Sequence, residues 1–422
     1  MANAFNKEER VAFEELLEGF NDALVLSRNV SKYSTDQTMM ERAGDRVWRP
    51  QPYIIESFTG TDMTSNFNDQ TQLSVPASID ISKSVPWIMT ATELRDALQE
   101  KRLGSAAKQR LASDVNVAVM NVAANQGSLV VPISTAASGF DDVALCEAIM
   151  NETGVMDGDR YLALSTRDYN GMAGNLAERQ TLTKKSLTAY EKAYIGQVAS
   201  FESYKLDYAN ALSAAAGAGI TFDNRTASAG YYVPKATDTN AINGGESNVD
   251  NRFQTITVSA TTDVAAGDAF TIAGVNAVHH ITKGDTGNLK TFRVISVDSG
   301  TTMTITPPII SNQGGSTAET QYQNCVVNTE SATAAITFLN TQDARVNPFW
   351  HKDAIEILPG RYAVPEDSGA AVMRGTTDQG LELVMQKFYD INTMKTKFRC
   401  DILFGVVNKA PEMSGIMLFS QT

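Results

Sequence analysis

The stretch NVDNRFQTITVSATTDVAAGDAFTIAGVNAVHH, residues 248–280, decides how the chain is divided. Its apolar and polar residues alternate in short runs separated by Gly and Asp, which is typical of β-strands joined by turns. The runs TFRVISVDSG and TMTITPP continue this pattern further along the chain. We therefore predict that residues 220–345 form a small all-β sandwich or barrel. Because mixed α+β patterns flank this block on both sides, it is expected to be a domain inserted into a loop of another domain.

Two helical patterns precede the β-rich block. In residues 7–28 one face is apolar and the opposite face is acidic, so the apolar face must be buried on this chain or on a neighbour. The apolar face carries Phe13, Leu16, Leu17, Phe20 and Leu24. In residues 90–126 an apolar residue recurs at every fourth position after TATE, where Thr90 and Glu93 fit a capping box. A helix over this range is a rod of roughly 54 Å, which is typical of a structural spine.

Residues 51–78 lie between these two helical patterns and are rich in Thr, Ser, Asn and Gln. A structureless loop of this length is uncommon inside a compact domain, so we expect an extended hairpin that projects from the chain. The segment contains neither Lys nor Arg, and this bears on cross-linking below.

Composition limits the classes of function. The formal net charge of −13 argues against a surface that grips phosphate backbones, although an acidic wall can still enclose DNA without adhering to it. Three cysteines lie far apart in the sequence, at Cys146, Cys325 and Cys400, and this spacing predicts buried free thiols. Neither a signal peptide nor an apolar run of roughly 18 residues is present, so we expect a soluble protein that stays in the cytoplasm.

Sequence signatures of catalysis are absent. The chain contains neither a phosphate-binding glycine motif nor a GxSxG nucleophile motif. His279 and His280 would point to opposite faces of a strand, so they are poorly placed to share a metal ion. Residues 238–249, DTNAINGGESNV, depart from a calcium-binding loop at the fifth, sixth and twelfth positions. We therefore predict no enzyme activity and no catalytic, cofactor or metal site.

Four segments carry a family resemblance. They are ELRDALQEKRLGSAAKQRLASDVNVAVMNVAANQGSLVV (93–131), AYIGQVASFESYKL (193–206), NVDNRFQTITVSATT with GDAFTIAGV (248–275), and DARVNPFWHKDAIEI (343–357). In this order they resemble the major coat proteins of short-tailed bacteriophages of the P-twenty-two type. Ser200 stands where that family usually has Gly in a GxVxGF-like turn.

The resemblance implies an α+β fold of the Hong Kong-97 capsid type with an inserted small β-barrel. The implied parts are an N-terminal arm (1–34), an extended loop (51–78), a peripheral domain with the spine helix (35–50 and 79–127, with strands from about 380–409), an axial domain with part of the peripheral sheet (128–219 and 346–422), and the inserted barrel (220–345).

The same resemblance implies a function in assembly. The chain would be a major capsid protein that forms hexamers and pentamers of an icosahedral phage shell in the host cytoplasm. Implied partners are other copies of the chain, a separate scaffolding protein, a portal protein, and double-stranded DNA enclosed without sequence-specific binding or a membrane. Some relatives join subunits by a lysine–asparagine bond that starts in the extended loop. Because residues 51–78 contain no Lys, we expect a non-covalent shell.

Two charged surfaces are candidate contact sites. The acidic face of the first helix is a candidate for docking a basic scaffolding helix, the alternative being a merely solvated face. Loop 236–251 would, by resemblance, reach a neighbouring capsomer, the alternative being an ordinary mobile loop. The residues concerned are Glu14, Glu15 and Glu18 on the helix, and Asp238, Glu246, Asp250 and Arg252 in and beside the loop.

Two other functions remain open at this point. A tail or decoration protein with a glycan-binding β-sandwich would account for residues 220–345 but would leave the predicted spine helix without a role. A protein compartment that encloses enzymes instead of a genome would use the same fold, and the large insert argues against it only by resemblance.

Overall fold

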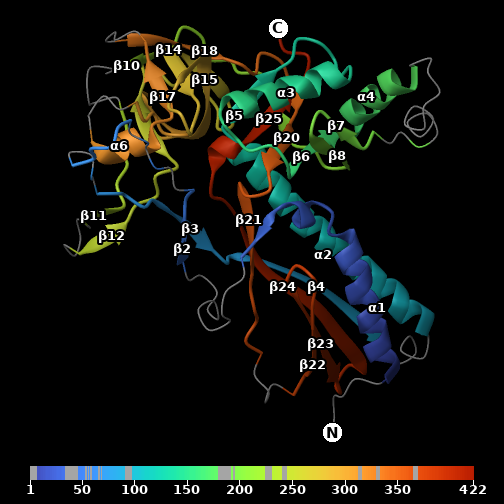
Figure 1. Cartoon of the computed structure of the whole chain (residues 1–422). Coiled ribbons are helices and arrows are strands. Elements are labelled where there is room, and N and C mark those ends of the chain that lie inside the picture. The colour runs from blue at the N-terminus through green and yellow to red at the C-terminus, as the bar shows by residue number, and fades with distance from the viewer. Residues whose placement is uncertain are drawn as a thin grey trace. The chain divides into compact units, whose positions relative to one another are not determined.

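The computed structural model of the chain (Figure 1) contains helices and sheets in two compact units, which confirms the predicted α+β class. The first unit lies within Met1–Val47, Ala77–Met120 and Ile355–Val407, and the second lies within Trp48–Pro76, Asn121–Ala354 and Asn408–Thr422. The residues that the structure describes are 7–33, 46–52, 55, 57, 59–64, 67, 69–90, 97–178, 192, 195–223, 231–239, 245–311, 316–328, 333–364 and 369–422.

A six-stranded sheet organises the first unit. Its strands follow the order β1, β21, β24, β23 and β22, and β4 also pairs with β24. Their bounds are β1 Ser31–Lys32, β4 Ile81–Thr90, β21 Ile355–Pro359, β22 Ala371–Thr376, β23 Glu382–Asp390 and β24 Lys395–Asn408. Half-buried Trp87 of β4 stacks on buried Phe398 of β24, with ring centroids 5.6 Å apart.

Helix α1, Lys7–Ala23, buries its apolar stripe on its own chain. Phe13, Leu16 and Phe20 are buried, and a Cβ added at Gly375 of β22 would lie 2.7 Å from Leu17 Cδ2. The predicted end at residue 28 is wrong: a 3-10 helix, η1 Leu26–Asn29, follows instead. At this point the amide of Leu26 donates to Asn116 Oδ1 of α2 at 3.2 Å, a side-chain partner of the kind that satisfies amides at helix ends.

The long helix α2 is present from Ala97 to Gln126. The side chains of Ala107, Leu111, Val115 and Val119 are buried, so the predicted repeat is confirmed for these residues. The predicted start at Thr90 is wrong, because Thr90 is the last residue of β4 and is paired with Lys395. The other half of the expected capping box, Glu93, lies outside the described residues.

A second six-stranded sheet, with the order β5, β25, β20, β6, β8 and β7, belongs to the second unit. The elements of this part are β5 Leu129–Pro132, α3 Phe140–Glu152, β6 Arg160–Ser165, α4 Thr166–Glu178, β7 Gln197–Val198, β8 Phe201–Leu206, β9 Ala211–Leu212, β19 Ala344–Arg345, β20 Asn347–His351, η4 Pro411–Met413 and β25 Ser414–Leu418. The run RYLALS, predicted as a strand, is β6, and its six residues are all buried.

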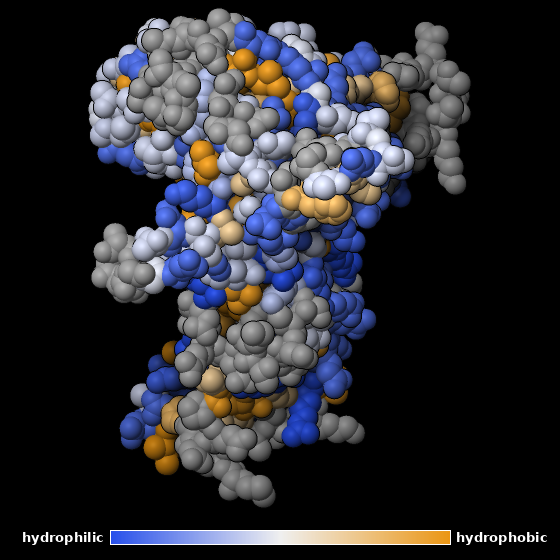
Figure 2. Space-filling view, turned by 60° about the vertical axis from the view of Figure 1, so that its left-hand side comes forward, coloured by the Kyte–Doolittle hydropathy of each residue, from blue (hydrophilic) through white to orange (hydrophobic). Residues whose placement is uncertain are grey.

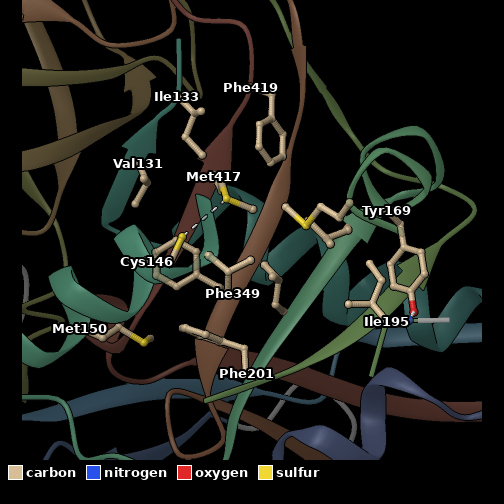
Figure 3. Packing of buried hydrophobic residues seen from close by; sticks show 14 of the residues in the cluster. Val131, Ile133, Cys146, Met150, Tyr169, Ile195, Phe201, Phe349, Met417 and Phe419 are labelled. Carbon is tan, nitrogen blue, oxygen red and sulfur yellow. Dashed lines mark hydrogen bonds between the residues drawn. The ribbon is translucent and has the colours of Figure 1, made fainter. Parts of the chain in front are cut away.

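Apolar side chains from α3 and from the sheet strands form the core of this part (Figure 3). Phe349 of β20 meets Phe201 of β8 edge-on, with centroids 6.0 Å apart, and Cys146 Sγ of α3 lies 3.7 Å from Met417 Sδ. Burial raises the pKa of the Cys146 thiol far above its ordinary value, so this cysteine is an inert core residue.

The turn before β8 explains a departure noted in the sequence. Ala199 and Ser200 have φ values of 42° and 63°, in the left-handed region that favours Gly. Ser200 therefore holds a conformation that suits the Gly expected by resemblance. Its hydroxyl accepts a long hydrogen bond of 3.4 Å from Arg160 Nη1, which ties the turn to β6.

The β-rich region, residues 220–345, forms a seven-stranded antiparallel sheet with the order β10, β18, β14, β15, β16 and β13, with β17 paired to β14. The bounds are β10 Thr221–Asp223, β11 Thr237–Thr239, β12 Glu246–Asn248, β13 Gln254–Thr257, β14 Ala269–Val278, β15 Asp285–Val297, β16 Thr302–Thr306, α6 Thr317–Tyr322, β17 Cys325–Val327 and β18 Thr333–Phe338. The strand candidates quoted above are thus confirmed. A bridge between Phe222 and Val258 brings the two ends of the strand order together.

Candidate functional site

The acidic face of α1 points away from the buried stripe. Glu14, Glu15 and Glu18 are all exposed, whereas Phe13 and Leu16 beside them are buried. The structure therefore exposes three acidic side chains on one helix face.

Glu9 is an acidic residue of the same helix with a different role. Its side chain is buried and pairs with Lys387 Nζ of β23 within the first unit. Among the acidic residues of α1 whose side chains the structure describes, Glu9 pairs with the sheet, and Glu14, Glu15 and Glu18 are exposed.

The strands β11 and β12 form a hairpin that stands apart from the seven-stranded sheet of its own unit (Figure 1). Asp238 pairs with Ser247 and Thr239 pairs with Glu246, and both acidic residues are exposed. Asp238 Oδ2 lies 3.6 Å from Lys235 Nζ, and more than half of each of these two side chains is exposed. An ion pair this open to water contributes little to stability. The carboxylates of Asp238 and Glu246 therefore remain in contact with solvent.

Asp250 and Arg252 form an ion pair with each other, and Arg252 also bonds to another part of the same chain. Arg252 Nε donates to Asp250 Oδ1 at 2.9 Å, and Arg252 Nη2 donates to Asp250 Oδ2 at 2.7 Å. Arg252 Nη1 donates to the carbonyl of Asn408 at 2.9 Å. Only 9% of the Arg252 side chain is exposed. Of the four predicted loop residues, the structure leaves Asp238 and Glu246 exposed and engages Asp250 and Arg252 with each other.

Asn251 closes the base of the hairpin, and sequence reasoning missed it. Its Nδ2 donates to the carbonyl of Lys235 at 2.8 Å, while its Oδ1 accepts from the Lys235 amide and from the Tyr232 hydroxyl at 3.0 Å each. Burial, together with the charges of Asp250 and Asp238, raises the pKa of Tyr232 to about 12, so this hydroxyl keeps its proton and donates. The sequence signal was a run of Asp, Asn and Arg directly after the hairpin.

Buried charges join the β-rich region to the rest of the second unit. Lys290 Nζ of β15 donates to Glu412 Oε1 of η4 at 2.5 Å, and His280 Nε2 lies 3.6 Å from Glu412 Oε2. Burial alone would raise the pKa of Glu412, but the charges of Lys290 and His280 outweigh it and lower the pKa below the ordinary value. Glu412 is therefore ionised at neutral pH.

Arg293 of β15 makes a second junction. Its Nη1 donates to the carbonyl of Ala124, near the end of α2, at 3.1 Å, and its Nε donates to the carbonyl of Gly267 at 3.0 Å. Burial lowers the pKa of Arg293 to about 10, which still leaves the guanidinium charged. A cation near the last turn of a helix also interacts favourably with the helix dipole.

The two adjacent histidines are structural, but they lie in a turn after β14 and not on a strand. The His280 amide donates to the carbonyl of Thr153 at 3.0 Å, and the His279 ring packs against Gly154. Within the described ranges, no group of three or more His, Cys, Asp or Glu side chains could hold a metal ion. Among the helices that the structure describes, none is long and apolar enough to cross a membrane.

A family model described as "P22 coat protein - gene protein 5" matches residues 1–420. A solved structure from Mycobacterium phage Che8 aligns with 93% of this chain and 90% of its own at 8% identity and a TM-score of 0.45. A capsid structure of the Cyanophage P-SCSP1u aligns with 93% of this chain and 86% of its own at 10% identity and a TM-score of 0.43. The CUS-3 coat protein I-domain aligns with 29% of this chain and 95% of its own at 44% identity and a TM-score of 0.22.

Proposed function

The chain belongs to the P22 coat protein family and is a phage capsid shell protein, and from this we propose that its copies assemble into the hexamers and pentamers of an icosahedral shell. The observation that carries the proposal is the family match over residues 1–420. In this proposal the shell forms in the host cytoplasm, includes a portal protein, and encloses double-stranded DNA. A net charge of −13 keeps the wall from adhering to the phosphate backbone.

We infer that the architecture is of the Hong Kong-97 capsid type, with α2 as the spine helix and residues 51–78 as the extended loop. The β-rich region is then the inserted β-barrel. Support for the barrel comes from its seven antiparallel strands and from the bridge between Phe222 and Val258.

Contacts between copies are weak one at a time in this proposal, because closure of the shell adds many of them together. On the face shown in Figure 2, hydrophobic residues form small separate patches on a mostly hydrophilic surface, which suits weak contacts. The absence of Lys from residues 51–78 supports a shell without covalent links from this loop.

The acidic face of α1 is the proposed docking site for a basic segment of a separate scaffolding protein. The buried apolar stripe of α1 packs on its own chain, and Glu14, Glu15 and Glu18 are exposed on the helix. Charges of this kind raise association rates and select partners more than they add affinity.

The hairpin of β11 and β12 is the proposed contact with a neighbouring capsomer. Asp238 and Glu246 supply exposed negative charge for it, while Asp250, Asn251 and Arg252 hold its base. Opposite charges on the neighbour would set the register of the two capsomers.

Negative-stain electron microscopy of the full chain, expressed alone and with a scaffolding protein, tests the function. We expect closed shells with hexameric and pentameric units when the scaffolding protein is present. Small uniform oligomers under both conditions would overturn the capsid proposal and favour a glycan-binding module.

A graded charge series tests the docking face. Replacement of Glu14, Glu15 and Glu18 by Lys should lower the scaffold-dependent assembly rate roughly tenfold or more, because like charges then meet. Replacement by Gln should give an intermediate rate, and high salt should reduce the difference between wild type and the Gln variant. Equal rates in all three proteins would mean that this face is only solvated.

Neutral substitutions test the hairpin. Asp238→Asn with Glu246→Gln should lower the yield of closed particles or give aberrant tubes. Asp263→Asn is the matched control, because Asp263 is an exposed acidic residue of the same region outside the hairpin and Asn tolerates its φ of 62°. Normal particles from the double variant would refute the hairpin contact.

A further inference from the structure

Hydrogen bonds and a strand pair join the two ends of the loop 51–78. Strands β2, Arg46–Pro50, and β3, Ser74–Ser78, pair as a two-stranded ribbon. The Gln51 amide donates to the carbonyl of Leu73 at 3.0 Å, and Gln72 Nε2 donates to the carbonyl of Gln51 at 3.1 Å. Leu73 and Val75 are 1% and 0% exposed, so the side chains at the root are packed.

Side chains of α6 bind the segment just before β3. The hydroxyl of Tyr322 accepts from the Leu73 amide at 3.2 Å and donates to the carbonyl of Thr71 at 3.0 Å. Gln321 Oε1 accepts from the Thr71 amide at 3.1 Å. These three bonds give two backbone amides and one backbone carbonyl of the segment their partners on α6.

The helix that supplies these groups is itself held at both ends. At its start the Glu319 amide donates to Ser316 Oγ at 3.1 Å, and the Ser316 amide donates to Glu319 Oε2 at 3.0 Å, which completes a capping box. After its end Asn324 is buried and accepts from the Ile310 amide at 3.1 Å. Such a fixed helix can impose a position on a backbone segment that binds to it.

A second attachment lies at Ser74, the residue directly after Leu73. Ser74 forms a parallel bridge with Asp250, and Asp250 accepts hydrogen bonds from both the amide and the guanidinium of Arg252. Arg252 is anchored in turn to the carbonyl of Asn408. The β-rich region therefore contacts the segment from Thr71 to Ser74 from two of its own elements.

We propose that the β-rich region sets the direction in which the loop 51–78 leaves the chain, with Tyr322 as the positioning residue. The hydroxyl satisfies one backbone donor and one backbone acceptor, so its loss would leave both groups unpaired at a partly buried site. The consequence for assembly rests on the proposed function: if the loop contacts a neighbouring copy, its direction at the root fixes where that contact falls. The β-rich region would then control contacts between copies through a loop that is far from it in sequence.

Hydrogen–deuterium exchange of the full chain, read on overlapping peptides that separate Thr71 from Leu73, tests the anchor. Tyr322→Phe keeps the ring and removes the hydroxyl, and we expect the Leu73 amide to exchange about tenfold faster, as loss of two hydrogen bonds allows. Gln321→Met removes only the acceptor for Thr71, and it should speed exchange of the Thr71 amide more than that of Leu73. Tyr204→Phe is the matched control, since its hydroxyl bonds Glu202 and contacts neither the loop nor α6 in the hydrogen bonds described.

Two results would overturn the proposal. One is an unchanged exchange rate at Thr71 and Leu73 in both variants, and the other is an equal rise throughout the β-rich region, which would indicate a general loss of stability. Faster exchange confined to the root supports the anchor even if no protein of the series forms shells. That last combination would refute the proposed function and not the anchor.

Discussion

The two sides of the β-rich region use charged residues in opposite ways. On the side that meets the rest of its unit, Lys290, Arg293 and Arg252 are buried and bonded to acceptors of the same chain. On the hairpin, Asp238 and Glu246 are exposed. The comparison teaches that residue type alone does not separate the charged residues that stabilise this region from those on its exposed hairpin. The burial of each side chain does separate them.

The energetic difference between the two sides has a simple origin. Removing one member of a buried pair leaves an uncompensated charge in a medium that solvates it poorly. Removing one member of an exposed pair leaves a charge that water solvates well, and such pairs contribute about 0–1 kcal/mol. Substitutions on the buried side should therefore act on stability, and those on the hairpin should act on contacts between copies.

The largest effect is expected from Lys290→Met, which leaves Glu412 ionised without its 2.5 Å partner. We expect a loss of about 2–3 kcal/mol in the free energy of unfolding, below the full cost of a buried pair because 23% of the Glu412 side chain is exposed. Urea unfolding followed by circular dichroism measures it.

The matched control for that experiment is Lys235→Met. Lys235 is 3.6 Å from Asp238, but both side chains are more than half exposed, so the change should stay within about 0.5 kcal/mol. Lys290→Met with Glu412→Gln should recover part of the loss, because the unpaired charge is then gone. Equal losses for the two lysines would remove the distinction between the two sides of the region.

A smaller effect is expected from pH. Burial lowers the pKa of His280 below its ordinary value of 6.5, aided by Lys290, Lys283 and His279 and opposed by Glu412. Between the two pKa values the unfolded chain binds a proton that the folded chain does not, so stability falls as pH is lowered through 6.5. One such proton changes the free energy of unfolding by at most about 1.4 kcal/mol per pH unit.

Urea unfolding of wild type and His280→Asn between pH 7.5 and 5.5 checks this prediction. The free energy of unfolding should fall less steeply with decreasing pH in the variant than in wild type. Part of the fall that remains in the variant should come from His351, whose pKa burial also lowers. The lowered pKa of Glu412 adds a loss of stability only at more acidic pH, when that carboxylate becomes protonated. A decline as steep in the variant as in wild type would show that His280 takes no part.

The smallest effect on stability is expected from the hairpin. Asp238→Asn with Glu246→Gln should change the free energy of unfolding by less than about 0.5 kcal/mol, because both carboxylates are exposed. Urea unfolding of the same preparation that is used for particle assembly checks this. A loss similar to that of Lys290→Met would mean that the hairpin is part of the stability core and not a contact surface.

Local patterns predicted the secondary structure well wherever one face is buried. The stripe of α1, the repeat in α2 and the strands of residues 248–306 follow periodicities that depend only on neighbouring residues. The errors fall where a distant partner overrides the local pattern. Thr90 is paired with Lys395 of β24, and the amide of Leu26 is bonded to Asn116 of α2.

The candidate surfaces were predicted less completely. Local patterning separated Glu14, Glu15 and Glu18 from the apolar stripe, since helix periodicity alone decides which residues share a face. It did not separate Asp250 and Arg252 from Asp238, because all of them lie in one polar stretch. The role of Asn251 at the base of the hairpin was missed for the same reason.

By itself, the sequence determined the α+β class, the long helix, the β-rich block and the absence of Lys from residues 51–78, because these follow from local periodicity and composition. Only the tertiary structure decided which charges of the β-rich region are buried and paired and which are exposed. Lys290 and Glu412 are 122 residues apart, and Leu73 and Tyr322 are 249 apart. The pairing of these residues depends on contacts between distant parts of the sequence, and a local pattern carries no information about such contacts.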